Sequence, residues 1–184
     1  SPRRAAYEIL LRVDDGAFSD LVLDTVLRRS RLDSRDRGLV TELVYGVLRL
    51  RGRIDFALEQ FCTQPLKRLQ PEVLRLLRLG AYQLLELDRV PAHAAVNSTV
   101  ELARELELHQ ATGFLNGVLR GVERGRADIE WPPPENIRRY LQHICSMPVW
   151  LTKELMRLLP NVEARAFGEA LALAAPHSLR VNSL

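Results

Sequence analysis

The sequence has few of the residues from which catalytic and metal sites are built. Its only two cysteines, Cys62 and Cys145, lie far apart, with no C-x-x-C pair and no histidine at metal-ligand spacing. No two of the four histidines can share a helical turn, and no glycine-rich phosphate loop is present. We therefore expect this chain to hold no catalytic residue, metal or cofactor, and its cysteines to be free thiols of a reducing compartment.

Long hydrophobic runs are also missing. Charged residues interrupt the apolar stretches every few positions, so none reaches the roughly 18 apolar residues of a membrane span. The N-terminal segment SPRRAAYEILLRV is amphipathic and lacks the cleavage pattern of a signal peptide. The expected location is the cytoplasm, without membrane contact.

Lysine is scarce, since it supplies only two of the 26 basic residues and arginine the rest. The planar guanidinium suits bidentate binding of phosphate, although a codon bias of the source genome would give the same composition. Residues 1–80 contain 15 Lys and Arg against 11 Asp and Glu, whereas residues 81–184 contain 11 against 12. The first half is therefore the candidate for contact with a polyanion.

The apolar residues recur at helical spacing, which predicts an all-α fold. The segment 72–87 is apolar except for one stripe formed by Glu72, Arg75, Gln83 and Glu86, so it should be a buried helix around which the others pack. Gly80 should let a neighbouring helix approach it closely. Further helices are expected at about residues 2–13, 19–29, 34–51, 54–61, 92–106, 112–123, 135–144, 148–158 and 162–173. Ser19 or Asp20 can cap the helix at 19–29, and Asp33, Ser34 and Asp36 offer a cap for the helix that follows.

Several arginines lie where stability alone does not favour them. Arg3 and Arg4 occupy the first turn of a helix, where the helix dipole disfavours cations, so an external phosphate is a plausible partner. Arg49, Arg51 and Arg53 alternate around Gly52, where the third helix should break. They form either a phosphate-contact cluster or a solvated turn whose cations suit a helix C-terminus.

Two further positions also allow two interpretations each. Arg78 lies outside the polar stripe of helix 72–87, where it either pairs at the edge of the core or awaits an anion in a groove. Asn116 shares the outer face of its helix with Arg120, and its amide holds either a neighbouring backbone or an RNA edge. The complete set of predicted RNA-binding residues is Arg3, Arg4, Arg35, Arg37, Arg49, Arg51, Arg53, Arg78, Asn116 and Arg120.

The composition changes after residue 123, where GRADIEWPPP is rich in glycine, charge and proline and predicts a linker or long loop. The last residues, HSLRVNSL, have a strand-like pattern without a partner strand. The expected division is a helical domain at 1–125, a linker and helical extension at 126–178, and at 179–184 the start of a truncated sheet-bearing region.

Several segments in the same order resemble one known family. LRLGAYQLLEL (77–87), VPAHAAVNSTVELA (90–103) and GFLNGVLRGV (113–122) resemble the core of the NusB-like RNA-binding fold. Together with RAAYEILLRV (4–13), SRDRGLVTELVYGVLR (34–49), MPVWL (147–151) and LRVN (179–182), they resemble more closely the N-terminal domain of the bacterial small-subunit ribosomal RNA cytosine-5 methyltransferases (RsmB, or Sun).

The resemblance implies a NusB-like bundle of two three-helix subdomains, with a helical extension, whose basic side contacts RNA. It also implies that a catalytic domain follows in cis, binds S-adenosylmethionine and modifies 16S rRNA, while the chain itself is a monomer. An alternative is a NusB-type transcription antitermination factor that binds RNA together with a ribosomal protein. A third is a helical domain that only packs against the catalytic domain.

Overall fold

The computed structural model describes residues 1–175, and over this range the chain is helical without any β-strand. The α-helices are α1 (Pro2–Asp14), α2 (Ser19–Arg29), α3 (Ser34–Arg49), α4 (Arg51–Glu59), α5 (Pro71–Glu86), α6 (Ala92–Glu105), α7 (Thr112–Gly125), α8 (Ile137–Arg139), α9 (Val149–Leu158) and α10 (Asn161–Ala172). Short 3-10 turns lie at Leu66–Arg68, His109–Ala111 and Arg126–Asp128, and a π-helical stretch, Tyr140–Ile144, continues α8. The expectation of an all-α fold is confirmed.

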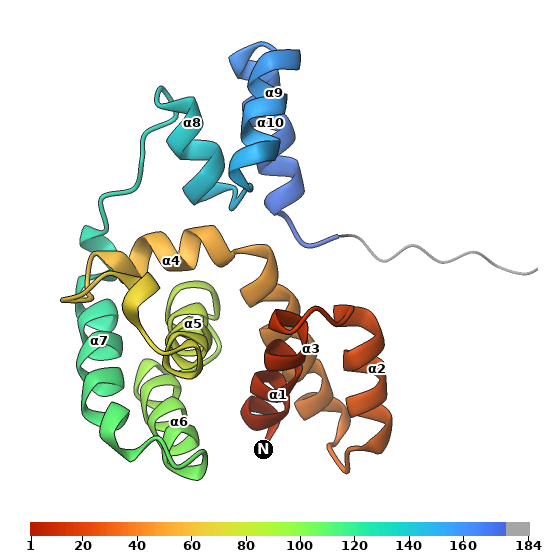
Figure 1. Ribbon diagram of the computed structural model, residues 1–184, viewed down its shortest axis with the longest axis vertical. Helices are drawn as coiled ribbons and strands as arrows, with labels where there is room; N and C mark the ends of the chain where they lie inside the picture. The colour runs from red at the N-terminus through yellow and green to blue at the C-terminus, as the bar shows by residue number, and fades with distance from the viewer. Residues whose placement is uncertain (176–184) are drawn as a thin grey trace, which may run out of the picture.

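Two groups of three helices make up the first two thirds of the chain. Helices α1, α2 and α3 pack against one another on one side, helices α5, α6 and α7 do so on the other, and α4 lies across them (Figure 1). Their apolar side chains form one continuous core, because α5 also packs against α1 and α3. This is the predicted bundle of two three-helix subdomains, and we call it the bundle below.

Helix α5 is the centre of the bundle, as its apolar circumference predicts. It contacts α1, α3, α4, α6 and α7. Even its polar stripe is partly buried, since Arg75 and Gln83 are 4% and 1% exposed. Arg75 donates from Nε and Nη2 to Asp14 Oδ2 at 3.0 and 2.9 Å, and Gln83 Oε1 accepts from Arg3 Nε at 2.7 Å. These two residues of the stripe therefore bond to α1 instead of facing water.

Close helix packing explains two glycines. A Cβ atom on Gly80 of α5 would lie 2.7 and 2.8 Å from the two methyl carbons of Leu119 on α7, so the predicted close approach is confirmed. A Cβ atom on Gly46 of α3 would lie 2.0 Å from the Tyr82 ring. The hydroxyl of this ring donates to Glu42 on α3, which joins α3 to α5 by a side-chain hydrogen bond.

One predicted helix break and one predicted cap were wrong. The break after α3 occurs at Leu50, and Gly52 lies inside α4. Gly52 is required there by packing, because a Cβ atom would lie 2.6 Å from the carbonyl oxygen of Gln142. Helix α2 has Phe18 at its N-cap without a side-chain hydrogen bond, where Ser19 or Asp20 was expected. Asp33 does cap α3 as predicted, accepting from the Asp36 N–H at 2.8 Å.

The segment predicted as a linker packs against the bundle. Ile129 is buried, and the Trp131 ring stacks on Phe56 of α4 with centroids 5.7 Å apart. Arg53 lies over the same Trp131 ring at 5.3 Å. The segment is thus an irregular connection with its own buried contacts, since aromatic and apolar side chains in it find partners on α4.

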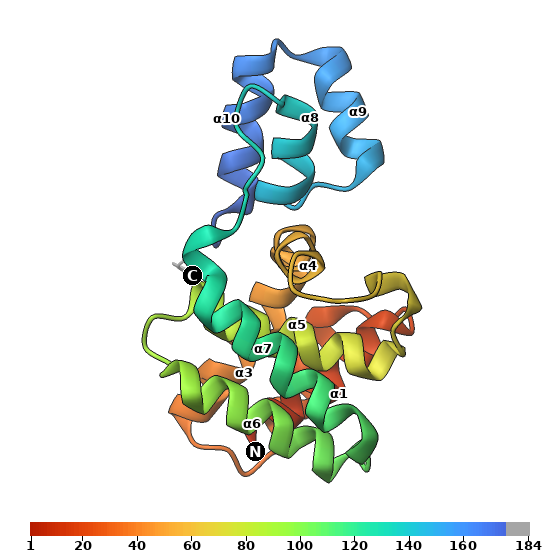
Figure 2. The same ribbon diagram turned by 90° about the vertical axis from the view of Figure 1, so that its left-hand side faces the viewer.

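Helices α8–α10 form a separate small cluster, called the extension below, which lies beyond α4 (Figure 2). Its core consists of Ile137, Leu141, Cys145, Met147, Leu155 and Ala164. It is held to α4 at Gly52 and by the Arg53 backbone N–H, which donates to Ser146 Oγ at 2.9 Å. The division at residues 125 and 178 stays a prediction, and the expected start of a further region at 179–184 lies outside the described residues.

Candidate nucleic-acid interface

Half of the ten predicted RNA-binding residues pair with carboxylates of the same chain. The pairs are Arg4 with Glu8 (3.0 Å) and Glu105 (3.7 Å), Arg51 with Asp14 (3.5 Å), Arg53 with Glu86 (3.2 Å), Arg78 with Asp55 (2.7 Å) and Arg120 with Glu123 (2.8 Å). Pairing reduces the charge that each arginine offers to a polyanion. These side chains therefore do not make up one uncompensated basic face.

Arg78 illustrates the structural role most clearly. Its side chain is 11% exposed and donates from Nε and Nη2 to the two carboxylate oxygens of Asp55 at 2.7 and 2.8 Å. This bidentate pair joins α5 to α4 at the edge of the core. The geometry favours the interpretation of edge pairing over that of a groove awaiting an anion.

Arg49, Arg51 and Arg53 do not converge on one point. Residues two apart on a helix lie about 200° apart, so Arg51 reaches Asp14 while Arg53 reaches Glu86 and the Trp131 ring. Burial raises the pKa of Glu86, and the charges of Arg53 and Arg49 oppose that rise. Arg49 ends α3, whereas Arg51 and Arg53 lie on α4 and pair with different neighbours on its two sides.

Arg3 and Arg37 bind neutral oxygens of the chain itself. Arg3 donates to Gln83, and its burial lowers the pKa of the guanidinium. Arg37 Nη2 donates to the backbone carbonyl of Leu27, one of the last carbonyls of α2. Arg3 joins α1 to α5 and Arg37 joins α3 to the preceding helix α2, which accounts for their positions without a bound phosphate.

Arg35 and Asn116 are exposed, but the hollows they line are not basic. The hollow at Arg35 has a volume of about 560 Å³ and is lined by two arginines and four acidic residues. The hollow at Asn116 has a volume of about 510 Å³ and is lined by one residue of each sign, Arg104 and Glu101. Since basic residues do not outnumber acidic ones in either hollow, neither favours binding of a polyanion.

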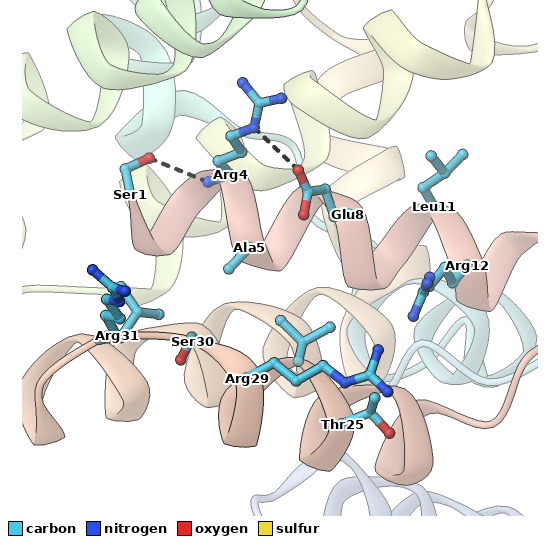
Figure 3. A pocket seen from close by; sticks show the side chains of 12 residues that line it. Ser1, Arg4, Ala5, Glu8, Leu11, Arg12, Thr25, Arg29, Ser30 and Arg31 are labelled. Atoms are coloured by element: carbon cyan, nitrogen blue, oxygen red, sulfur yellow. Dashed lines mark hydrogen bonds and ion pairs between the residues drawn. The ribbon is translucent and has the colours of Figure 1, made fainter.

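A more basic groove lies between α1 and α2, with a volume of about 710 Å³. Four arginines and a single carboxylate line it: Arg4, Arg12, Arg29, Arg31 and Glu8. In Figure 3 Arg4 and Glu8 point away from α2 toward each other, whereas Arg12 extends from α1 toward α2 and Arg29 extends along the groove. Arg12, Arg29 and Arg31 are exposed and make no ion pair within residues 1–175.

Sequence reasoning missed these three arginines as site residues. The arginines named as candidates in the first half were Arg3, Arg4, Arg35, Arg37, Arg49, Arg51, Arg53 and Arg78, and Arg12, Arg29 and Arg31 were not among them. A usable signal was present, because the basic sequence RRSR spans the C-terminal end of α2 at residues 28–31. What the sequence did not indicate is that α1 and α2 lie side by side and bring the arginines of both to one groove.

Neither thiol resembles a reactive group. Cys145 is buried, Cys62 is half-buried and both are free. Burial raises the pKa of each thiol to about 11, which keeps it protonated at neutral pH. Over residues 1–175 no three His, Cys, Asp or Glu side chains come together in a manner that would hold a metal ion. In the same range no helix has the length and apolar character needed to cross a membrane.

The fold is an all-helical bundle of two three-helix groups with a groove rich in arginine, and comparison with known families agrees with this class of fold. The model of the NusB family matches residues 1–124, which are α1 to almost the end of α7. The chain therefore belongs to the NusB family, as its motifs predicted.

Curated relatives extend the comparison beyond residue 124. A probable ribosomal RNA small subunit methyltransferase B of Bacillus subtilis (strain 168) is 34% identical over 185 aligned residues, covering 100% of this chain and 41% of that protein. The ribosomal RNA small subunit methyltransferase B of Serratia proteamaculans (strain 568) is 33% identical over 98% of this chain and 40% of its own length. A putative methyltransferase of Mycobacterium tuberculosis is 44% identical over 70% of this chain and 28% of that protein. The chain thus spans about two fifths or less of the length of these relatives.

Proposed function

We propose that this chain is an RNA-binding domain that docks an S-adenosylmethionine-dependent ribosomal RNA methyltransferase on its substrate, and that RNA lies in the groove between α1 and α2. The observation that carries the proposal is the excess of arginine along this groove: four arginines and one carboxylate line it, and Arg12, Arg29 and Arg31 make no ion pair within residues 1–175. Contacts to phosphate supply most of the sequence-independent affinity of a protein for nucleic acid.

The groove has the dimensions of a site for a strand. Arg4 and Arg12 are eight residues apart on α1, which corresponds to about 12 Å along the helix axis. Arg29 and Arg31 line the opposite side, and Ala5, Leu11 and Val26 supply apolar surface between the two rows. Guanidinium groups on both sides suit the phosphates of a backbone, and the apolar surface between them suits sugar or base faces.

The ten residues predicted from the sequence have a smaller part in this proposal. Arg4 belongs to the groove and is half-exposed, so RNA could compete with Glu8 for its guanidinium. Arg35 and Asn116 are available for peripheral contacts. The other seven act mainly through the fold, because each is part-buried or joined to a neighbouring helix.

The methyltransferase activity belongs in this proposal to the longer polypeptide. The curated relatives that bear the name methyltransferase B match beyond residue 124, which favours this function over a transcription antitermination factor. S-adenosylmethionine, the cytosine-C5 transfer to 16S rRNA and a catalytic domain in cis are thus proposed for such a polypeptide, acting as a monomer in the cytoplasm. The residues described here would position it.

The test is RNA binding by the double variant Arg12→Glu, Arg29→Glu. Measured by fluorescence anisotropy with a 16S rRNA fragment at low salt, affinity should fall at least tenfold, since two phosphate contacts become repulsions. The matched control is Lys67→Glu, Arg68→Glu, which makes the same change of charge at two exposed residues away from the groove. For the unmodified chain log Kd should rise linearly with log salt. Equal loss of affinity in both variants, or none in either, would contradict the proposal.

A further inference from the structure

Helix α10 has an apolar face that no described part of the chain covers. Val162, Ala166, Phe167, Ala170 and Leu171 recur at helical spacing on one side of the helix and are all exposed, Val162 by 80% and Phe167 by 45%. We call these five residues the α10 face; Glu163 lies in the same arc. The opposite side of the helix carries Ala164 and Gly168, which are buried against the extension.

Exposed apolar side chains are concentrated in this part of the molecule. Apart from the α10 face, Val149, Trp150, Leu158 and Leu173 are more than half exposed, and all lie between residues 149 and 173. The bundle exposes Phe18 and Leu21 to a similar degree, both near the start of α2. Apolar surface gathered on one short segment is typical of a region that another protein surface covers.

The charge of helices α9 and α10, which carry the exposed apolar side chains, argues for a protein partner. Residues 149–175 contain three basic residues, Lys153, Arg157 and Arg165, and three acidic ones, Glu154, Glu163 and Glu169. Arg157 pairs with Glu154 and Arg165 with Glu169, each within its own helix. A neutral apolar surface attracts neither RNA nor an anionic membrane, since both require excess positive charge.

The size of the α10 face argues for a partner in the same chain. The 12 residues of α10 span about 18 Å, so the face offers a few hundred Å² at most, roughly half or less of the 800 Å² per partner that a stable intermolecular interface buries. A covalently connected partner needs less area, because the connection supplies an effective concentration on the order of millimolar.

We propose that the α10 face packs against the part of the longer methyltransferase B polypeptide that lies outside the segment matched by this chain. The NusB family model ends at residue 124, before the extension begins. The Bacillus relative aligns with this whole chain but has more than half of its length outside the match. The extension is thus shared with longer proteins, and its uncovered face is the surface by which the bundle would be held to the remainder.

The test compares thiol labelling in residues 1–184 and in the native gene product that contains them. Ala166→Cys places a thiol on the α10 face, and Ala17→Cys places one in the exposed turn between α1 and α2 as a matched control. The two native thiols react slowly, since burial raises the pKa of each to about 11. Both introduced thiols should react at similar rates with a maleimide in residues 1–184. In the native gene product the Ala166→Cys thiol should react at least tenfold more slowly, and the Ala17→Cys thiol at an unchanged rate.

Two outcomes would overturn the proposal. Equal labelling of the Ala166→Cys thiol in both forms would mean that nothing in the longer chain covers the face. If labelling of the Ala166→Cys thiol in residues 1–184 became slower as the protein concentration rose, a second copy of the chain would be covering the α10 face. A second, independent test uses Phe167→Glu, which places a charge on the α10 face. It should leave the melting temperature of residues 1–184 unchanged and lower that of the native gene product. RNA affinity of the α1–α2 groove does not enter either measurement, so the two proposals fail separately.

Discussion

The bundle and the extension differ in how much of their surface each buries for itself. In the bundle, apolar side chains from α1 to α7 form one core around α5, and several of them are completely buried. The extension has a core of six side chains and leaves one face of α10 open. Because stability grows with the apolar area buried, the bundle can fold without help, whereas the extension depends on its neighbours.

Ion pairs between helices differ in the same way, since within residues 1–175 they occur in the bundle and not in the extension. Asp14 with Arg75 and Asp55 with Arg78 join helices that are far apart in sequence, and their arginines are nearly buried. The ion pairs of the extension connect residues three or four positions apart on exposed helix surfaces. Contacts between helices resist unfolding of the whole unit, while those within one helix support only that helix.

The largest expected effects come from substitutions in the two apolar cores, which test whether the bundle and the extension unfold independently. Leu76 of α5 and Leu141 of the extension are both completely buried, so replacing each with alanine removes equal volumes. Leu76→Ala should lower the free energy of unfolding of the bundle by about 2–5 kcal/mol, measured by urea denaturation. Leu141→Ala should speed amide hydrogen exchange in residues 137–172 and leave α5 protected. If Leu141→Ala also removes protection from α5, the two regions form one cooperative unit and the comparison is wrong.

Substitutions in the ion pairs should change the stability of the two regions by smaller and unequal amounts. Asp14→Asn leaves the buried guanidinium of Arg75 without its charged partner and should cost about 1.5–3 kcal/mol. Glu154→Gln makes the same chemical change in an exposed pair of the extension and should change stability by about 0.5 kcal/mol or less. Thermal unfolding followed by circular dichroism distinguishes them. Comparable costs for the two variants would show that local and long-range pairs contribute alike.

The smallest expected effect concerns pH at the contact between the two regions. His143 of the extension lies on the Phe56 ring of α4, with centroids 4.6 Å apart. Burial, aided by the charge of Arg139, lowers the pKa of His143 below its usual 6.5. When the extension separates from α4, His143 becomes exposed and binds a proton at a higher pH than it does when packed on Phe56. The packing of the extension on α4 should therefore weaken as pH falls below about 6.5.

Trp131 fluorescence in urea measures this docking, in a Trp150→Phe background that removes the exposed tryptophan of the extension. The midpoint should be lower at pH 5.5 than at pH 7.5. His143→Phe keeps an aromatic ring without the titrating group and should reduce the difference. A difference that persists unchanged in this variant would assign the pH effect to another group.

Much of the helical architecture was predictable because it depends on local patterns. The apolar circumference of residues 72–87 indicated the buried helix, Gly80 indicated a close neighbour, and Asp33 indicated a cap. The break at Leu50 was not predictable. Glycine often marks the end of a helix because it is flexible, but Gly52 is required inside α4 by close packing against Gln142. The irregular segment with Ile129 and Trp131 was interpreted as a linker because its partners on α4 are distant in sequence.

The candidate site was less predictable than the fold. The sequence shows how many arginines the first half carries, but an arginine has the same letter whether it bonds to Asp55 across the core or faces water. Carboxylates that neutralise Arg51, Arg53 and Arg78 lie 23 or more residues away, and periodicity does not pair them.

The sequence alone thus determined the helices, their apolar faces and membership of the NusB family, because these follow from short-range spacing and from motif order. Only the tertiary structure decided which cations remain without an ion pair within residues 1–175, and that Arg12, Arg29 and Arg31 share a groove. It also decided that one face of α10 is covered by nothing within residues 1–175. The physical reason is that charge compensation and coverage depend on distances between helices, and these arise only when the helices pack.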